Sequence, residues 1–257
     1  MIKIITTWGG PGGSTVALNN LVNLFNERGD EACLYAPNKW EGVTCNWDDI
    51  NNVSFKEDDI VIYHYMKFEK RPNVAKLILS CHETRVFPIK NQDGMIYDDV
   101  HFVSEFQKKW QAIDGRVIPN VVQKYEPKDN KFKVTTAGVL GSIDSNKRTH
   151  LSIQRALEEG HTDIRLYGAV TDPGYFVNKV VPLLGDKVSY RGVASDMQTV
   201  YDNVTDVQPS HELESFNLIK PECKYAKVNY HGHEGNDTQA EYWDDDKVYD
   251  AWKKLLT

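Results

Sequence analysis

The stretch IKIITTWGGPGGSTVALNNLVNLFNERGDEACLYAP, residues 2–37, decides the fold class. It begins with a β-rich run at residues 2–7 and continues through a glycine-rich turn at 9–14, which no regular element tolerates. Apolar residues then recur at helical spacing over 15–28, and a second β-rich run follows at 31–37. This alternation of strand, helix and strand predicts an α/β protein, with a parallel sheet covered by helices.

The same alternation continues along the chain and restarts after a polar linker. Before the linker, further elements are predicted at residues 59–65, 74–80, 101–104, 105–113 and 116–118. The linker, residues 123–133, contains a proline and has no periodicity. After it, elements are predicted at 134–140, 147–159, 164–167, 175–184, 188–190, 195–203 and 206–208. We therefore expect two α/β domains, 1–125 and 126–257, with a last helix near 246–256 available to pack back on the first.

Composition and charge exclude several classes of protein. The 257 residues are 40% hydrophobic and 26% charged, which is ordinary for a globular chain. The net charge of -7 argues against a protein that simply coats nucleic acid. Residues 61–133 nevertheless carry 13 basic and 9 acidic side chains, and such a stretch can meet an anionic partner. Four widely spaced cysteines and the lack of a long apolar run predict a cytoplasmic protein with neither a disulfide framework nor a membrane span.

The glycine-rich turn is a candidate anion site. A strand that enters such a turn and then a helix points backbone N–H groups and the positive end of the helix at a ligand. Gly12 and Gly13 are therefore candidate substrate-binding residues. A dinucleotide site is disfavoured, because Thr15 stands where the third glycine of G-x-G-x-x-G belongs and no acidic residue ends the second strand. The sequence also contains no G-K-[ST], which excludes a P-loop.

Charged residues in the second half indicate how a nucleotide could be held. Lys147 and Arg148 are adjacent at a predicted helix start, where cations oppose the helix dipole unless an anion compensates them. The segment QPSHELESFNLIKPE, residues 208–222, leaves a strand and enters an apolar run. If a helix begins near Asn217, the Glu222 carboxylate can accept two hydroxyl hydrogen bonds, as a ribose diol requires. A solvated cation pair and a helix-capping carboxylate are the simpler alternatives.

With these motifs in place, the chain resembles the nucleotide-sugar glycosyltransferases of the GT-B fold, in particular the retaining family 4. Residues 209–223 resemble the C-terminal pattern P-S-x-x-E-G-F-G-L-x-x-x-E-A. Further matches, in order along the chain, are Gly9 to Ser14, Cys81-His82-Glu83, Val103-Ser104-Glu105, Val117 to Asn120, Asn146-Lys147-Arg148 and Lys227-Val228. The resemblance implies two facing Rossmann-like domains with a cleft between them, the first for the acceptor and the second for the donor.

The resemblance also implies roles for individual residues. Glu222 would bind the ribose, and Lys147 with Arg148 would bind the diphosphate. His82 would face the transferred sugar, so the candidate catalytic residues are His82, Glu214 and Lys147. The sugar would be held by Glu214 and by the residues after it, Ser215, Phe216, Asn217 and Leu218. No metal or other cofactor is implied.

The sequence departs from the family pattern at three positions. Ser215 and Asn217 replace glycines, which changes how closely the backbone can approach the sugar, and Gly141 replaces an arginine often found six residues before the phosphate lysine. Two segments near the C-terminus are rich in acidic residues or histidines, and neither indicates a metal site. The run Asp244 to Asp246 suits the start of the last helix, and His231-Gly-His233-Glu234 with Asp237 matches no known zinc ligand set.

The sequence therefore predicts an enzyme that transfers a hexosyl or pentosyl group from a UDP- or GDP-linked sugar to an acceptor hydroxyl, with retention and without a metal. The basic stretch favours an anionic acceptor, which could be a cell-surface glycan, a lipid, or a hydroxymethylated DNA base as in phage DNA modification. Two alternatives stay open, a sugar-nucleotide 2-epimerase of related fold and a non-catalytic nucleotide-binding module. The oligomeric state cannot be predicted from these features.

Overall fold

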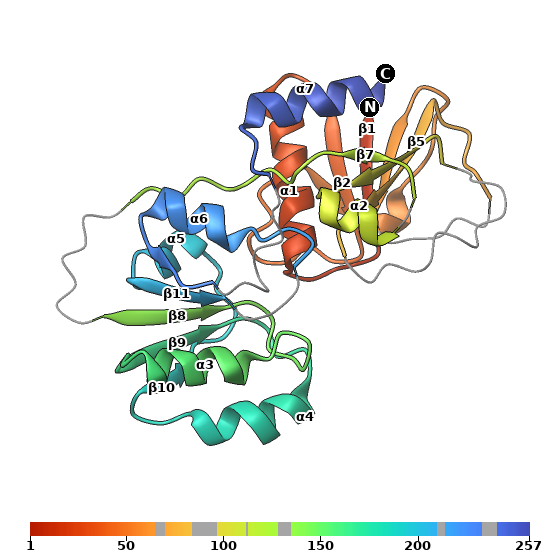
Figure 1. Cartoon of the computed structure of the whole chain (residues 1–257). Helices are drawn as coiled ribbons and strands as arrows, with labels where there is room; N and C mark the ends of the chain where they lie inside the picture. Colours follow the sequence, from red (N-terminus) through yellow and green to blue (C-terminus); the bar gives the residue numbers. More distant parts are fainter. Residues whose placement is uncertain (65–69, 84–96, 112, 128–134, 210–213, 233–240) are drawn as a thin grey trace. The chain divides into compact units, whose positions relative to one another are not determined.

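In the computed structural model the chain divides into two compact units, each built on one parallel sheet (Figure 1). The structure describes all residues except 65–69, 84–96, 112, 128–134, 210–213 and 233–240. Unit 1 comprises Met1–Val122 and Thr238–Thr257, and unit 2 comprises Gln123–Asp237. In the described part of the chain, no helix has the length and apolar character needed to cross a membrane.

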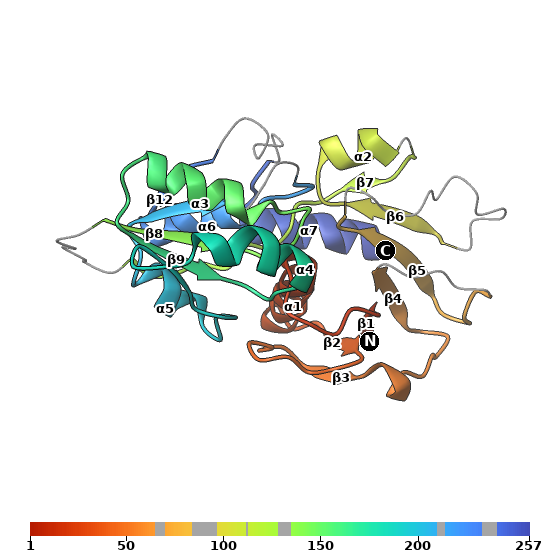
Figure 2. The same ribbon diagram turned by 90° about the horizontal axis from the view of Figure 1, so that it is seen from below.

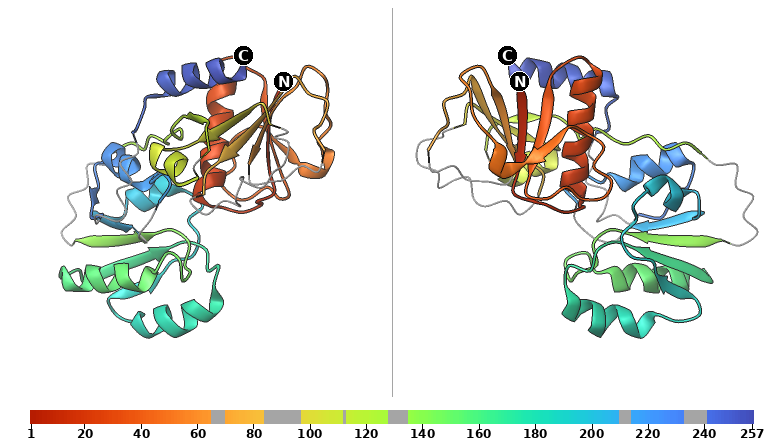
Figure 3. Two further views of the ribbon diagram at one scale, coloured as in Figure 1. Left: turned by 45° about the vertical axis from the view of Figure 1, so that its right-hand side comes forward. Right: turned by 180° about the vertical axis from the view of Figure 1, so that it is seen from behind.

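Unit 1 is organised around a seven-stranded parallel sheet in the order β3-β2-β1-β4-β5-β6-β7, which can be followed in Figure 2. Its strands are β1 (Ile2–Thr6), β2 (Ala32–Ala36), β3 (Trp47–Asp49), β4 (Ile60–His64), β5 (Lys76–Cys81), β6 (Asp99–Phe102) and β7 (Arg116–Val117). Its helices are α1 (Gly13–Glu27), α2 (Glu105–Gln111) and α7 (Asp245–Leu256), with a 3-10 turn at Ile50–Asn52. The two ends of the chain lie near each other in this unit (Figure 3).

The core of unit 1 follows from the alternation of side chains along its strands. Ile4 and Leu34 face the side where α1 and α7 pack, and Trp252 of α7 is buried among them. Ile5 and Val61 face the opposite core. Successive strand residues point to opposite faces, so one apolar run supplies both cores. The edge strand β3 was not predicted, because its three residues are too few to show a period.

Unit 2 is organised around a five-stranded parallel sheet in the order β10-β9-β8-β11-β12. Its strands are β8 (Thr136–Leu140), β9 (Asp163–Tyr167), β10 (Val188–Tyr190), β11 (Asp206–Pro209) and β12 (Asn229–Tyr230). The helices α3 (Thr149–Glu158) and α4 (Pro173–Tyr175) share one core with β9 and β10. The helices α5 (Met197–Tyr201) and α6 (Ile219–Ala226) share a second core with β11.

One predicted helix of unit 2 is irregular. The sequence predicted a continuous helix over residues 175–184, but α4 passes into a π-helical turn, Phe176–Val180, and then a 3-10 turn, Val181–Leu183. Pro182 lies in that last turn. A proline has no N–H to donate and its ring clashes with the preceding turn, so a regular α-helix cannot continue through it.

Candidate functional site

Each sheet reverses its strand order at one place, and ligands of such sheets bind there, beyond the carboxyl ends of the strands. The reversal lies between β1 and β4 in unit 1 and between β8 and β11 in unit 2. The glycine turn follows β1, and His82 follows β5, the neighbour of β4. Lys147 follows β8, and Glu214 follows β11. The predicted site residues of each unit are therefore close to the carboxyl edge of its own sheet.

A carboxylate holds the turn that carries Lys147. Asp144 accepts hydrogen bonds from the backbone N–H groups of Asn146 (2.9 Å) and Lys147 (2.8 Å) and from the hydroxyls of Ser142 (2.8 Å) and Thr171 (2.9 Å). Burial acts to raise the pKa of Asp144, but the hydrogen bonds outweigh it and the pKa is lowered. The ionised carboxylate therefore fixes the backbone from which Lys147 extends.

Lys147 and Glu214 come together at the edge formed by β8 and β11. The Lys147 ammonium donates a hydrogen bond to the Glu214 carboxylate, and both side chains are partly exposed. Arg148 is exposed and has a left-handed backbone, with φ of 46°. The sequence predicted that both cations open a helix, whereas α3 begins only at Thr149. The reason is local, since the Asp144 carboxylate stabilises a turn through the N–H groups that would otherwise begin the helix.

A close backbone approach also shapes this edge of unit 2. Gly168, after β9, has a φ of +154°, and Gly141, after β8, has a φ of +130°. A Cβ atom on Gly168 would stand 1.8 Å from the Gly141 carbonyl oxygen, so only glycine fits there. Any side chain at Gly141 would be strained by its backbone angle. An arginine at position 141 would therefore have a strained backbone in this structure.

Glu222 lies in the first turn of α6 and is only 5% exposed. Its carboxylate accepts a hydrogen bond from the Tyr201 hydroxyl at 2.7 Å, and the rings of Tyr201 and Tyr125 are 4.9 Å apart. Burial raises the pKa of Glu222 to about 7, against the lowering effect of the Tyr201 hydrogen bond. Near neutral pH the side chain therefore exists in both protonation states, and the ionised state is the stronger acceptor for hydroxyl groups.

The predicted sugar-binding segment between Glu214 and α6 packs inward. Phe216 and Asn217 are buried, while Ser215 and Leu218 are half-buried. The Asn217 amide donates to the Tyr230 hydroxyl at 2.5 Å and accepts from the backbone N–H of Lys220 at 3.3 Å. The side chain that replaces a family glycine therefore stabilises the start of α6.

In unit 1 the glycine turn leads into α1, with Gly12 as the residue before the helix and Gly13 as its first residue. The buried Thr15 hydroxyl donates to the carbonyl oxygens of Gly10 (2.7 Å) and Gly12 (3.0 Å). A Cβ atom on Gly10 or Gly13 would meet nothing within 4 Å. The fold of the described residues therefore leaves room for a side chain at these two positions.

His82 belongs to a buried chain of hydrogen bonds in unit 1. The Ser80 hydroxyl lies 3.0 Å from His82 Nε2 and 2.8 Å from His101 Nδ1, and His101 Nε2 lies 2.8 Å from the Ile118 carbonyl oxygen. That carbonyl only accepts, so His101 Nε2 carries a proton, Ser80 donates to His101, and His82 Nε2 donates to Ser80. Burial, together with His64 and His101, lowers the pKa of His82 well below its usual value, so His82 is neutral at pH 7.

A second chain at the same edge was not predicted from the sequence. The His64 ring joins Thr6 Oγ1, 2.9 Å from its Nδ1, to the Glu83 carboxylate, 3.1 Å from its Nε2. The ring centroids of His64 and His82 are 5.0 Å apart. The motif match at 81–83 included Glu83, but the role was assigned to His82 alone. His64 ends a buried strand and has no motif, so only its contacts reveal it.

The histidine-rich and acidic segments near the C-terminus have structural partners where the structure describes them. His231 lies 2.8 Å from the Asp206 carboxylate and 3.4 Å from that of Glu159. Asp244 accepts from the backbone N–H of Lys247 and begins α7. His233, Glu234 and Asp237 lie outside the described residues. Within the part of the chain that the structure describes, no group of three metal-ligating side chains is found.

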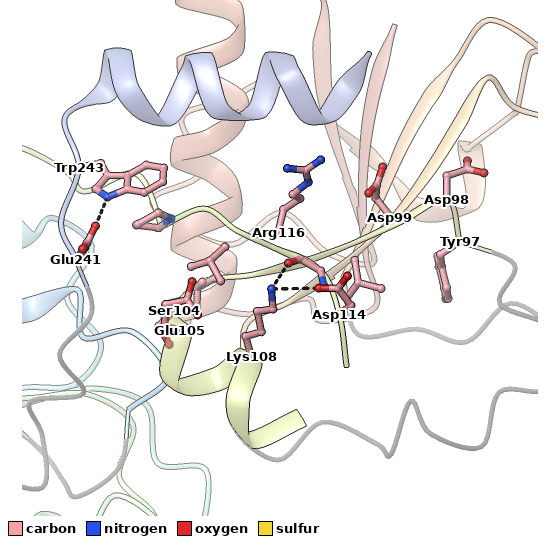
Figure 4. Close-up of a pocket in the computed structure, with 15 residues that line it drawn as sticks. Tyr97, Asp98, Asp99, Ser104, Glu105, Lys108, Asp114, Arg116, Glu241 and Trp243 are labelled. Atoms are coloured by element: carbon pink, nitrogen blue, oxygen red, sulfur yellow. Dashed lines mark hydrogen bonds and ion pairs between the residues drawn. The ribbon is translucent and has the colours of Figure 1, made fainter. Parts of the chain in front are cut away.

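Several basic residues of the stretch 61–133 pair with aspartates of unit 1. Arg71 pairs with Asp98 at 2.6 Å, and Lys76 pairs with Asp99 at 3.2 Å. Both aspartates also line a pocket of about 810 Å³ along β6, α2 and β7, where Lys108 pairs with Asp114 (Figure 4). None of the predicted site residues lines this pocket.

Comparisons with known proteins identify solved structures of similar architecture. No family model matches the chain, and no curated protein matches it in sequence. Among solved structures, the pneumococcal O-GlcNAc transferase GtfA in complex with UDP and GlcNAc matches with a TM-score of 0.67 and 10% identity, covering 99% of this chain and 91% of that chain. WaaG, a glycosyltransferase involved in lipopolysaccharide biosynthesis, matches with a TM-score of 0.64 and 13% identity, covering 100% and 90%.

A third match is an alpha-glucosyltransferase in complex with UDP and a 13-mer DNA containing a HMU base, with a TM-score of 0.56, 10% identity, and coverage of 99% of this chain and 89% of that chain. These identities are low, so the likeness concerns the fold. Membership of the retaining family 4 and the roles of single residues stay predictions. The resemblance inferred from the motifs is confirmed at the level of architecture, and the chain has the fold of the GT-B glycosyltransferases.

Proposed function

We propose that the protein is a glycosyltransferase that moves a sugar from a UDP-linked donor to an acceptor hydroxyl. The observation that carries the proposal is the Lys147–Glu214 ion pair at the edge formed by β8 and β11, in a fold shared with glycosyltransferases. UDP is favoured over GDP because GtfA and the alpha-glucosyltransferase were both solved with UDP.

The ion pair suits the charge changes of sugar transfer. A diphosphate must leave with its negative charge while the sugar becomes oxocarbenium-like, and a fixed cation stabilises the departing group. Lys147 can exchange its carboxylate partner for the diphosphate, since its backbone is held by Asp144 and its side chain is partly exposed. Glu214 is then free to accept hydrogen bonds from sugar hydroxyls, and Arg148 adds a second cation.

Glu222 completes the donor side of the proposal. Its ionised carboxylate would accept the two ribose hydroxyls, with Tyr201 holding one oxygen in place. The residues from Ser215 to Leu218 lead into the N-terminus of α6, whose partial positive charge favours a phosphate or a polarised sugar oxygen. His82, Gly12 and Gly13 belong to unit 1 and are proposed to face the transferred sugar and the acceptor.

Retention and metal-free transfer are finer parts of the proposal. Retention rests on the motif resemblance, and the anomeric proton of the product, observed by NMR, tests it. Transfer without a metal is proposed because Lys147, Arg148 and a helix N-terminus supply positive charge for the diphosphate. Activity that survives chelation by EDTA supports this, and a panel of UDP-hexoses and UDP-pentoses identifies the sugar.

The nature of the acceptor stays a prediction. The anionic class was inferred from basic residues, and Arg71 and Lys76 are paired with aspartates in the structure. A glycan, a lipid or a hydroxymethylated DNA base remains consistent with the fold. An acceptor bound through its phosphates predicts activity that falls steeply with added salt, whereas a neutral acceptor predicts little change.

The decisive experiment removes the proposed phosphate cation. Lys147→Ala should lower the transfer rate by at least about 100-fold, the scale of losing one charge-stabilising donor. It should also reduce the rise in melting temperature that UDP produces, because a ligand stabilises in proportion to its affinity. Lys224→Ala is the matched control, since Lys224 is an exposed lysine of α6 in the same unit. Unchanged turnover in Lys147→Ala would refute the proposed role.

The two alternatives give different results in the same assay. A 2-epimerase would convert the donor sugar with no acceptor present, and product analysis of donor alone detects this. A non-catalytic module would be stabilised by UDP without any turnover.

A further inference from the structure

The segment with which unit 2 begins, residues 123–127, is anchored on the helix α5, and we call it the junction segment. Gln198 of α5 forms two hydrogen bonds with the backbone of Glu126. Its side-chain oxygen accepts from the Glu126 N–H at 2.9 Å, and its side-chain nitrogen donates to the Glu126 carbonyl oxygen at 2.8 Å. Because one amide satisfies both backbone groups of one residue, it fixes the main chain at this point.

A second contact of the junction segment leads to the carboxylate that is proposed to bind the ribose. The ring of Tyr125 packs against the ring of Tyr201 in α5, with centroids 4.9 Å apart and planes at 49°. The Tyr201 hydroxyl donates to Glu222 Oε2 at 2.7 Å, and the side chains of Tyr201 and Glu222 are both buried. The junction segment therefore supports Tyr201, and Tyr201 orients the Glu222 carboxylate.

Glu222 is the group of this cluster whose charge changes near neutral pH. Burial raises its pKa to about 7. Burial also raises the pKa values of Tyr125, Tyr201 and Cys223, so these three neighbours stay neutral between pH 6 and 8. Hydrogen bonds at the start of α5 lower the pKa of Asp196, which acts on Tyr125 and stays ionised. Ionisation of Glu222 strengthens its contact with Tyr201, because a carboxylate is a stronger acceptor than a neutral carboxyl group.

A bound nucleotide would change the charge of Glu222. Two ribose hydroxyls that donate to the carboxylate favour its ionised form, so binding below pH 7 releases the proton of Glu222 to the buffer. Building on the proposed donor site, we propose that Tyr125 is a positioning residue for Glu222, and that nucleotide binding and anchoring of the junction segment stabilise each other. The effect is reciprocal, because linkage between two equilibria acts equally in both directions.

The affinity for UDP tests the positioning role of Tyr125. In calorimetry at pH 7, Tyr125→Ala should raise the Kd of UDP at least about fivefold, because Tyr201 loses the ring that supports it. Tyr125→Phe keeps the ring, and its Kd should stay within about twofold of the unmodified protein. Tyr225→Ala is the matched control, because Tyr225 is an exposed tyrosine of α6 in the same unit and should leave the Kd unchanged.

Hydrogen exchange tests the coupling in the unmodified protein, so it does not depend on how a variant folds. Saturating UDP should slow amide exchange in the junction segment, measured by mass spectrometry and corrected for the intrinsic rate at each pH. The slowing should be at least about twofold greater at pH 6 than at pH 8, because at pH 8 Glu222 is ionised before UDP binds. In Glu222→Gln, which cannot ionise, the slowing should not depend on pH.

The outcomes separate this inference from the donor function. A rise in melting temperature with UDP, reduced in Glu222→Gln, establishes the donor site independently of Tyr125. With the donor site established, equal Kd values in Tyr125→Ala and Tyr225→Ala would overturn the positioning role. Slowing that is the same at pH 6 and pH 8 would overturn the coupling through Glu222. If UDP neither binds nor slows exchange in the unmodified protein, the donor proposal fails and this inference fails with it.

Discussion

Units 1 and 2 share a strand order but differ in the chemistry at the carboxyl edge. In each, the order extends outward from the first strand in the same way, as β3-β2-β1-β4-β5 and as β10-β9-β8-β11-β12. Unit 1 has two hydrogen-bonded chains, one from Thr6 through His64 to Glu83 and one that joins Ser80 to two histidines. Unit 2 has the Lys147–Glu214 ion pair and the buried Glu222. The comparison shows that the shared backbone determines where a ligand can bind, and the side chains determine which ligand.

The units also differ in how pH acts on their buried groups. In unit 1, His82 and His101 have lowered pKa values, so acid favours an unfolded state in which they can be protonated. In unit 2, Glu222 has a raised pKa, so alkaline pH favours an unfolded state in which it can ionise. The six tryptophans lie in unit 1, and fluorescence therefore follows that unit alone, while circular dichroism follows both.

The largest expected effect is a loss of stability in unit 2, while the stability of unit 1 is unchanged. Gly168→Ala would place a Cβ atom 1.8 Å from the Gly141 carbonyl oxygen at a φ of +154°, and should cost more than about 4 kcal/mol of unfolding free energy. We expect the fluorescence melting curve to be unchanged, because each unit has its own buried cores. Circular dichroism should show a second, earlier transition.

Gly160→Ala provides the matched control for this substitution. Gly160 also has a positive φ, +87°, but its Cβ atom would meet nothing within 4 Å. Its cost should be limited to backbone strain of about 1 kcal/mol. A fluorescence transition that moves together with the circular dichroism in Gly168→Ala would contradict independent units.

The next effect concerns the buried carboxyl of unit 2. The folded pKa of Glu222, about 7, lies above its ordinary value of 4.5, so stability is lost as the pH rises from about 4.5 through 7. Glu222→Gln should remove this loss and stabilise the unliganded protein above pH 7 by up to about 3 kcal/mol. The same change should weaken UDP binding. Chemical denaturation between pH 5 and 8, followed by circular dichroism, measures how the unfolding free energy changes with pH.

Glu158→Gln is the control for that experiment, because Glu158 is an exposed carboxylate of α3 in the same unit. It should leave the pH slope and UDP binding as they are. If Glu222→Gln lowered stability throughout this range, burial of the charged form would not be the dominant cost at this site.

The smallest expected effect concerns the buried histidines of unit 1. Burial lowers the pKa of His101 to about 4, although its hydrogen bond to Ile118 opposes this, so stability is lost as the pH falls below 6.5. Between pH 6.5 and 5 the loss from His101 should be about 2 kcal/mol. His101→Asn should make the unfolding free energy, measured by fluorescence, depend less on pH below 6.5. This holds whatever its effect on absolute stability.

His150→Asn tests whether this slope belongs to unit 1. His150 lies in α3 of unit 2, and its pKa is lowered by burial and by Lys179 and Arg148. Because fluorescence follows unit 1, this substitution should not alter the fluorescence slope. If the loss of stability at acid pH were unchanged in His101→Asn, it would have to come from other groups.

Much of the fold could be predicted from local patterns. The run at residues 2–7 and the helix over 15–28 correspond to β1 and α1, because the periods of strands and helices are visible in the order of apolar residues. The strand β3 and the composite helix after α4 were not predicted. The strand depends on pairing with β2, and the irregular helix depends on Pro182, which changes the turns around it.

The candidate site could be predicted in part. Motifs indicated Lys147, Glu214 and Glu222, and the structure brings Lys147 to Glu214, which are 67 positions apart in sequence. It also revealed Asp144 and His64, which carry no pattern that single-sequence reasoning could rank above other polar residues. Glu83 belonged to the motif match at 81–83, and the structure added its contact with His64. The contact of His64 with Thr6 joins positions 58 apart, and no local period encodes such a pair.

The order of residues by itself determined that this protein is α/β, with two parallel sheets and polar turns after the first strand of each, because hydrophobic periodicity is a local property of the chain. Tertiary structure alone decided which polar groups meet at those turns and which of them are charged. The physical reason is that hydrogen-bond geometry and burial depend on residues distant in sequence, and both shift the pKa of a group such as Glu222 or His82.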